Sequence, residues 1–523
     1  MKTLLSTILF FTLQLSFAQQ VDIIIKNGKI IDGTGNSWYY ADLAIKDGKI
    51  ILIQKNIQIN AAKTIDAKGF IVAPGFIDVH THIEDDEVKN PLATNFIYDG
   101  VTTVITGNCG LSRVDLKKYF HLLDSIKLSI NVASMIGHND VREYVMKKAN
   151  REPTTAEMQQ MEILVTNAMK AGAVGLSTGL IYTPGNYSKT KEIIALAKIA
   201  AQYNGVYATH MRSEGDSIVD AINEAINIGR SCNMPVEISH FKLAGQNNWG
   251  RSAETLGLVK AAREQGLDVT IDQYPYTASS TTLSTLFPDW ALANGQDSIN
   301  ARLKRIKDKN EIANFIISRL KKRSQNHFNY VVVANYPSDT SLNGKNIQQI
   351  NLLKGRKDTA TEEVKTIFEI IRNGGASCVF HGMSETDVQY FVQYPFNMFA
   401  SDGTIRVMNV GVPHPRSYGT NARVLAKYVR EEKLISLEEA IRRMTSLPAQ
   451  KFNLKNRGLL KEGFAADIVI FNPATVQDES TFAKPHQYSK GFSYVIVNGA
   501  VTLEDEKHTQ KRNGIVLYGE GKE

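Results

Sequence analysis

The sequence has few cysteines and, beyond its first 20 residues, no apolar run long enough to span a membrane. Only three cysteines, Cys109, Cys232 and Cys378, occur in 523 residues. So few cysteines exclude a disulfide scaffold, and an odd number leaves at least one thiol free. A membrane helix needs about 20 apolar residues, so we expect no membrane insertion of the mature chain.

Neither sign of charge dominates the sequence. The formal net charge is +7, from 60 Lys and Arg against 53 Asp and Glu, and the positive charges form no block. This pattern argues against a nucleic acid partner, whereas weak positive charge suits an anionic small molecule. The apolar content of 43% and charged content of 22% are usual for a globular protein.

Residues 1–18 are typical of a cleavable signal peptide. Lys2 provides a basic start, an interrupted apolar run extends from Leu4 to Phe17, and small residues precede the end at Ala18. The run is too short for a membrane anchor. We therefore expect export, with cleavage near Ala18, to a periplasmic or extracellular location.

The two ends of the mature chain have similar patterns of short strands and turns. Residues 19–68 alternate β-type runs with Asn-Gly and Asp-Gly turn signals, the first of them at Asn27-Gly28, and residues 446–523 contain comparable runs around another Asn-Gly. We expect the two ends to form one small β-sandwich beside a central domain of residues 69–445.

Strand-like and helical segments alternate through the central domain. This alternation favours an α/β fold with a parallel sheet, and a number of strands near eight favours a (β/α)₈ TIM-like barrel over an open doubly wound sheet. Residues from about 281 to 353 interrupt the alternation and are interpreted as an inserted subdomain near the active site. The predicted barrel strands are Val101–Thr106, Asn131–Ile136, Ala173–Leu180, Val206–His210, Pro235–His240, Val269–Gln273 and Ser377–Phe380.

Zinc-binding residue types occur where several of these strands end. His80 and His82 follow an apolar strand, and side chains two residues apart on a strand point the same way. Cys109, His210 and His240 each lie at the carboxyl end of another predicted strand. Barrel enzymes build their sites at this rim, and thiolate and imidazole groups are favoured zinc ligands. Any one of these residues taken alone is more often structural.

Asp402, in Phe399-Ala400-Ser401-Asp402-Gly403, follows a late apolar stretch. Taken alone, an aspartate before a glycine is typical of a turn. Beside zinc ligands, its carboxylate is suited to accept a proton from water and return it to the leaving nitrogen of an amide. We therefore predict that Asp402 acts as a general base.

The motifs together resemble the amidohydrolase superfamily, and specifically the N-acyl-D-amino-acid deacylase family. The motifs that carry this resemblance are PGFIDVHTH, GNCG, ATHMR, ISHFK, DQYPYTASS, FASDG and HPRSYGT. The GNCG motif takes the place of the carboxylated lysine of many superfamily members. The resemblance extends over nearly the whole mature chain, and the preference for D-amino acids rests on it alone.

The resemblance implies one tightly bound zinc ion on Cys109, His210 and His240. It implies a second, weaker zinc position on His80, His82 and Asp402, which Cys109 would bridge. For the substrate carboxylate it points to a cation, a phenol, a hydroxyl and a guanidinium, which are Lys242, Tyr274, Ser279 and Arg416. Tyr276 is a less favoured alternative to Tyr274.

Residues 274–294 predict the preferred substrate side chain. Asp289 is the only charged residue of this segment, and Leu283, Leu286, Phe287 and Trp290 are apolar. We therefore expect a preference for N-acyl derivatives of apolar D-residues, because no cation of this segment faces an acidic side chain.

Other readings remain open at this point. The same zinc site is compatible with a cyclic amide, a dipeptide or N-acyl-D-glutamate as substrate, because fold and metal do not determine the substrate. A non-catalytic exported binding protein would keep the barrel but lack part of the metal site or the base. The sequence leaves the acyl group and the oligomeric state undetermined.

Overall fold

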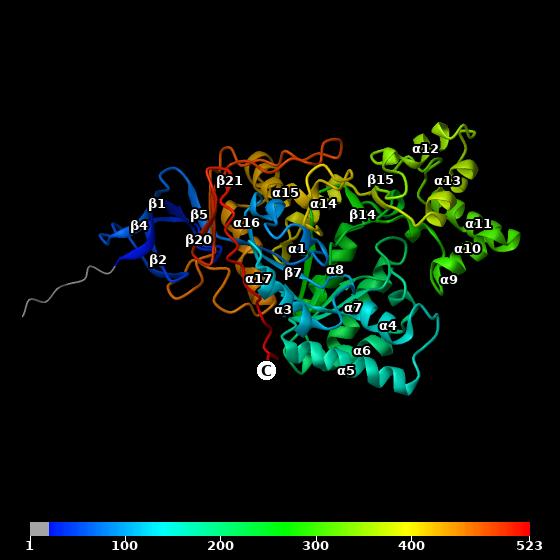
Figure 1. Cartoon of the computed structure of the whole chain (residues 1–523), viewed down its shortest axis with the longest axis horizontal. Helices are drawn as coiled ribbons and strands as arrows, with labels where there is room; N and C mark the ends of the chain where they lie inside the picture. Colours follow the sequence, from blue (N-terminus) through cyan, green and yellow to red (C-terminus); the bar gives the residue numbers. More distant parts are fainter. Residues whose placement is uncertain (1–19) are drawn as a thin grey trace, which may run out of the picture.

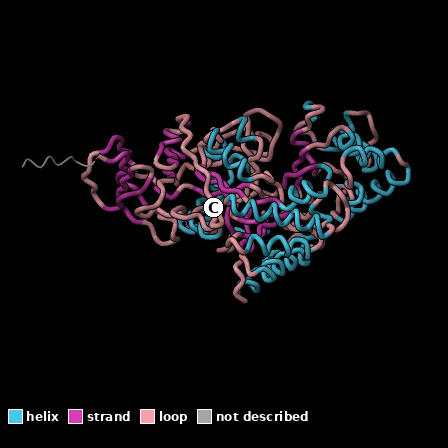
Figure 2. Tube along the Cα trace, turned by 60° about the horizontal axis from the view of Figure 1, so that its bottom comes forward, coloured by secondary structure: helices cyan, strands magenta, loops and turns pink. Residues whose placement is uncertain are grey.

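The computed structural model describes residues 20–523, so the predicted signal peptide lies outside the described residues. Its centre is a barrel of parallel strands surrounded by helices (Figures 1 and 2). The barrel strands are β6 (Phe76–Asp78), β7 (Val101–Thr106), β8 (Asn131–Ser134) with its continuation β9 (Ile136–Gly137), β10 (Gly175–Gly179), β11 (Val206–His210), β12 (Val236–Ile238), β13 (Val269–Gln273) and β17 (Asn397–Phe399).

The barrel closes between its first and last strands. Thr81, just after β6, pairs in parallel with Gly403, just after β17, and the His82 amide donates to the Gly403 carbonyl at 2.8 Å. Closure therefore places the end of β6 directly beside the end of β17. The fold class predicted from the alternation of strands and helices is confirmed.

Helices follow the barrel strands and cover the outside of the barrel. Capping residues mark the ends of these helices, as α5 illustrates. It begins with a capping box formed by Thr154 and Glu157 and ends before Gly172, whose φ of 110° suits glycine. Within residues 20–523, no helix combines the length and the apolar character that crossing a membrane requires. The helices around the barrel are α1 (Asp86–Lys89), α2 (Thr94–Ile97), α3 (Leu116–Ile126), α4 (His138–Met146), α5 (Thr155–Ala171), α6 (Thr190–Ala201), α7 (Ile218–Cys232), α8 (Ser252–Glu264), α14 (Glu385–Val392), α15 (Arg416–Arg423), α16 (Leu437–Met444) and α17 (Ser446–Lys451).

The two ends of the chain form one β-domain, at the left of Figure 1. The expected pairing of the ends is present, because β5 and β18 run antiparallel with four residues in register. The turn expected at Asn27-Gly28 is instead a bulge inside β1, where Asn27 has a φ of 60°. The strands are β1 (Val21–Ile30), β2 (Tyr39–Lys46), β3 (Lys49–Gln54), β4 (Ala61–Asp66), β5 (Ile71–Pro74), β18 (Ile468–Phe471), β19 (Phe492–Val497), β20 (Ala500–Glu504) and β21 (Lys507–His508).

A separate subdomain is inserted after β13 and has its own apolar core, at the right of Figure 1. The prediction that Ser377–Phe380 forms a barrel strand is wrong: β16 pairs antiparallel with β14 and β15 instead. Short apolar strands of either type look alike in sequence, which explains the error. The inserted elements are β14 (Ala278–Thr282), α9 (Asp289–Leu292), α10 (Gln296–Lys304), α11 (Ile306–Lys322), β15 (Val331–Asn335), α12 (Ile347–Leu353), α13 (Ala360–Arg372) and β16 (Ser377–His381).

Candidate active site

The structure brings all six predicted metal-ligand side chains to one end of the barrel. Around the Cys109 Sγ lie His80 Nε2 at 3.3 Å, His240 Nε2 at 3.6 Å and His210 Nδ1 at 3.8 Å. Ligand atoms on a tetrahedral zinc ion with bonds of about 2.0–2.3 Å lie about 3.5 Å apart. The thiol and the imidazoles therefore have the spacing and the chemistry of a zinc site.

Asp402 lies on the other side of His80. Its Oδ1 is 3.2 Å from His82 Nε2 and 3.6 Å from His80 Nε2. His80 thus borders two groups of ligands, one containing Cys109 and His240 and the other containing His82 and Asp402. The second group consists of the three residues of the weaker position that the resemblance implies. The first contains Cys109 and His240 of the tight position, and His210 approaches the Cys109 Sγ at 3.8 Å.

Three of the candidate ligands have left-handed backbone conformations. The φ angles are 52° at Cys109, 48° at Asp402 and 37° at His240. Such conformations are uncommon for residues with a Cβ and tend to occur at functional sites. Each lies just after a barrel strand, where the turned backbone directs the side chain toward the barrel axis.

Buried carboxylates hold the ligands in place from behind. Asp272, at the end of β13, contacts His80 Nδ1 at 3.1 Å and accepts from the His240 amide at 2.8 Å. Asp78 accepts from the amides of His80 and Ser401, which joins the strand before the histidines to the loop before Asp402. A partner on Nδ1 leaves the His80 Nε2 free to face a metal ion.

The charges around the site favour ionised ligands. Burial opposes ionisation of the Cys109 thiol, but the positive charge of His80 and hydrogen bonds from His210 and His240 hold its pKa well below its usual value. Burial likewise opposes ionisation of Asp402, and the charges of Arg416 and His80 outweigh it, so the pKa of Asp402 is well below its usual value. A thiolate and a carboxylate are the forms that bind a cation.

Lys242 lies beside the metal ligands and is paired with Glu214, a residue that the sequence analysis did not single out. The Lys242 Nζ is 2.5 Å from Glu214 Oε1, and His240 Nδ1 is 2.9 Å from the same oxygen. Burial opposes both charges, yet their attraction raises the pKa of Lys242 and, with the neighbouring histidines, lowers that of Glu214. Glu214 therefore orients both His240 and Lys242.

The other predicted substrate residues also lie at this end of the barrel. Arg416 places NH1 2.9 Å from Asp402 Oδ2, and its guanidinium lies 4.4 Å from the centre of the Tyr274 ring. The buried Tyr274 hydroxyl has no hydrogen-bond partner in residues 20–523. Tyr274 and Ser279 line the cavity beside the metal ligands, whereas Tyr276 packs toward Arg423 and Asp478.

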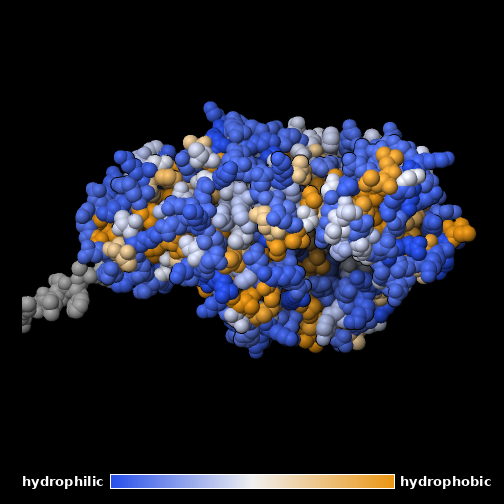
Figure 3. Space-filling model, turned by 45° about the horizontal axis from the view of Figure 1, so that its top comes forward, coloured by the Kyte–Doolittle hydropathy of each residue, from blue (hydrophilic) through white to orange (hydrophobic). Residues whose placement is uncertain are grey.

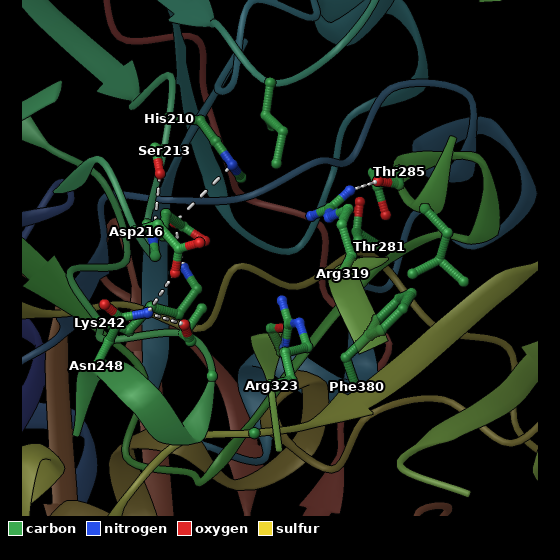
Figure 4. Close-up of a pocket in the computed structure, with 18 of the residues that line it drawn as sticks. His210, Ser213, Asp216, Lys242, Asn248, Thr281, Thr285, Arg319, Arg323 and Phe380 are labelled. Atoms are coloured by element: carbon green, nitrogen blue, oxygen red, sulfur yellow. Dashed lines mark hydrogen bonds and ion pairs between the residues drawn. The ribbon is translucent and has the colours of Figure 1, made fainter. Parts of the chain in front are cut away.

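A cavity of about 320 Å³ extends from the metal ligands to the inserted subdomain. In Figure 3 the surface is hollowed between these two parts. His210 and Lys242 lie along one wall of the cavity, and Arg319 and Arg323 of the inserted subdomain lie along the other (Figure 4). The inserted subdomain therefore contributes to the site, as its predicted position near the active site implied.

The cavity contains cations that residues 274–294 do not supply. Residues 274–294 contain no cation, but Arg319, Lys322 and Arg323 line the same cavity from farther along the chain. They reach the cavity because the end of α11 folds back onto this segment, where Arg319 donates to the Thr285 carbonyl. The segment itself contains no cation, as expected, but the cavity that it lines does. The preference for apolar side chains stays a prediction.

A barrel with thiolate, imidazole and carboxylate groups at the carboxyl ends of its strands is the arrangement of a metal-dependent barrel enzyme. A family model described as "Amidohydrolase family" matches residues 63–310 and 342–503. The chain belongs to the amidohydrolase family.

Relatives match nearly the whole chain. A D-aminoacylase of Alcaligenes xylosoxydans xylosoxydans is 34% identical, over 96% of this chain and 98% of its own length. An N-acyl-D-aspartate deacylase from the same organism is also 34% identical, over 95% of both chains. A crystal structure of an N-acyl-D-glutamate deacylase from Bordetella bronchiseptica, complexed with zinc and a phosphonate inhibitor, has a TM-score of 0.83 and 34% identity, covering 96% of this chain and 100% of its own.

Proposed function

We propose that this protein is a zinc-dependent hydrolase that cleaves the amide bond of N-acyl-D-amino acids into a carboxylate and a free D-amino acid. The observation that carries the proposal is the convergence of Cys109, His210 and His240 with Asp402 at one end of the barrel. The relatives with deacylase names, similar over nearly their whole length, support the same reaction.

The residues present fit a zinc ion. Cys109, His210 and His240 would hold it tightly, because thiolate and imidazole are favoured zinc ligands and both imidazoles lie within 3.8 Å of the Cys109 Sγ. His80, His82 and Asp402 form a second group and would provide a weaker position. Zinc bound there supplies Lewis acidity, which polarises the scissile carbonyl and makes a water molecule more acidic.

The side chains of this protein perform the proton transfer and the positioning. Asp402 accepts a proton from the attacking water at its carboxylate and returns it to the leaving nitrogen. Arg416, 2.9 Å from Asp402, keeps this carboxylate ionised and directed into the cavity. Tyr274, Ser279, Arg416 and Lys242 lie where they would orient the carboxylate of the amino acid.

We also propose that the protein is exported from the cytoplasm. The basic start and interrupted apolar run of residues 1–18 support a cleavable signal and action in the periplasm or outside the cell. N-terminal sequencing of protein secreted by a bacterial host tests the cleavage, which we expect near Ala18. A mature protein that retains residue 1 would contradict export by this route.

A chiral substrate panel tests the reaction itself. Zinc-loaded mature protein should release the free amino acid from N-acetyl-D-amino acids at least about 100-fold faster than from their L-enantiomers, measured as kcat/KM. A D-hydantoin and a D-containing dipeptide belong in the same panel. Cleavage of either at a higher kcat/KM than every N-acyl-D-amino acid would contradict the proposal.

A further inference from the structure

Two arginines of the inserted subdomain face the cavity from the C-terminal end of α11. Arg319 lies in the last turn of α11, and Arg323 is the residue directly after the helix. Both line the cavity and lie across it from His210 and Lys242 (Figure 4). On the barrel wall Lys242 is paired with Glu214, whereas the two arginines place positive charge on the wall of the insertion.

The charges of these arginines have no carboxylate partner. Arg319 donates to the Thr285 carbonyl at 2.6 Å, and the Arg323 guanidinium lies 5.6 Å from the centre of the Tyr330 ring. No ion pair joins either arginine to a carboxylate in residues 20–523. By contrast Arg212, another cation of the cavity wall, pairs with Glu224 at 3.0 Å.

Holding two like charges together is unfavourable unless an anion binds between them. Burial and the neighbouring charge of Arg323 both lower the pKa of Arg319. The charges of two exposed cavity carboxylates, Asp289 on the insertion and Asp216 on the barrel, raise this pKa, but neither forms an ion pair with Arg319. Asp216 accepts a hydrogen bond from Asn248 at 3.3 Å. Two half-buried guanidinium groups that line a cavity and form no ion pair with a carboxylate in residues 20–523 have the chemistry of a carboxylate-binding site.

We propose that Arg319 and Arg323 bind a second carboxylate of the substrate, so that the preferred substrates are dianionic N-acyl-D-amino acids. This inference rests on the proposed function. The first carboxylate occupies the barrel wall near Arg416 and Tyr274. Arg319 contacts Thr285, which lies in the segment expected to face the substrate side chain. The second carboxylate is therefore that of a D-glutamate or D-aspartate side chain. A carboxylate on the acyl group has the same chemistry, and the experiment below distinguishes the two sources.

The comparisons leave this choice open, and the arginines lie where the family model does not match. The D-aminoacylase, the N-acyl-D-aspartate deacylase and an N-acyl-D-glutamate deacylase of the same organism are 34%, 34% and 32% identical to this chain. The matched ranges stop at residue 310 and resume at residue 342, which excludes both arginines. The preference must therefore come from the side chains of this protein.

Three substrates and three variants test the inference in the zinc-loaded full-length mature protein. The substrates are N-acetyl-D-glutamate, N-succinyl-D-leucine and the neutral-side-chain reference N-acetyl-D-leucine. Arg319→Gln keeps a donor for the Thr285 carbonyl, and Arg323→Gln removes a side chain that donates no hydrogen bond within residues 20–523. Lys321→Gln is the matched control, because this exposed lysine of α11 loses the same charge outside the cavity.

We expect the wild type to show a kcat/KM at least about 10-fold higher for one dianionic substrate than for N-acetyl-D-leucine. Each arginine variant should lose about 10- to 100-fold on that substrate, mostly through KM, and change less than about 3-fold on N-acetyl-D-leucine. Lys321→Gln should behave as wild type. Loss confined to N-acetyl-D-glutamate assigns the second carboxylate to the side chain, and loss confined to N-succinyl-D-leucine assigns it to the acyl group.

Two results overturn the inference without touching the proposed function. The first is a wild type that hydrolyses N-acetyl-D-leucine faster than both dianionic substrates, and the second is arginine variants that slow all three substrates equally. The proposed function fails by a different result, in which no N-acyl-D-amino acid of any charge is hydrolysed by the zinc-loaded protein.

Discussion

The two walls of the cavity differ in how they are built. On the barrel wall, Cys109, His240 and Asp402 come from separate strand ends and are held by buried partners such as Asp272. On the inserted wall, Arg319 and Arg323 come from the last turn of α11 and the residue after it, and they make few polar contacts. A preorganised cluster of metal ligands suits bond cleavage. Side chains of a separate subdomain can be substituted without disturbing that cluster. The difference assigns chemistry to the barrel and side-chain selection to the insertion.

The largest effect should come from removing the thiolate of the barrel wall. Cys109→Ser should lower kcat/KM by about 10⁴-fold or more for every substrate, because the zinc ligands act as a unit. The variant should also retain less zinc after dialysis, measured by mass spectrometry of the metal. Cys232→Ser, at a half-buried thiol of α7, is the control. Full zinc and near-normal turnover in Cys109→Ser would remove this residue from the site.

Asp402→Asn should have the next largest effect. Loss of the proton acceptor should lower kcat by about 10²- to 10⁴-fold on dianionic and neutral substrates alike. The zinc held by Cys109, His210 and His240 should remain. Asp289→Asn, a carboxylate on the inserted wall of the same cavity, should keep most of the activity. Unchanged turnover in Asp402→Asn would show that another group transfers the proton.

Much of the barrel wall could be predicted from sequence, and the inserted wall could not. His80, Cys109 and His240 each follow a strand of regular pattern, and the ends of barrel strands converge by geometry. Glu214 and Asp272 were missed because a carboxylate near a histidine has no distinctive spacing. Arg319 was missed because its approach to Thr285 depends on how the insertion folds back, a contact between residues 34 apart.

Glu214→Gln tests one of these missed residues. Because Glu214 contacts both Lys242 Nζ and His240 Nδ1, loss of its charge should lower kcat/KM by about 10- to 100-fold. The loss should be the same for all substrate side chains. The loss in Arg323→Gln should instead depend on the charge of the substrate, and this difference separates the roles of the two walls. The control is Asp216→Asn, an exposed carboxylate two residues away. If both variants match the wild type, Glu214 does not position the site.

Lys451→Met, far from both walls, should affect stability and leave activity unchanged. Lys451 ends α17 and its Nζ lies 3.1 Å from Asp268 Oδ2, just before β13 begins. Burial lowers its pKa from 10.5 to about 8. Between these values the unfolded chain binds a proton that the folded protein does not, so the wild type gains stability as the pH rises from about 8 to above 10.

A methionine of similar size has no such titration. The Lys451→Met variant should therefore be more stable than the wild type by about 1–3 kcal/mol at pH 7, and this advantage should shrink toward pH 10. Asp268 keeps Arg263 as a partner at 2.9 Å, so its carboxylate is not left alone. Melting temperatures at pH 7, 8.5 and 10 measure the trend. If the stability advantage of Lys451→Met grew with pH, the lowered pKa of Lys451 would be contradicted. A loss of kcat would show that residues at the opposite end of the barrel also affect catalysis.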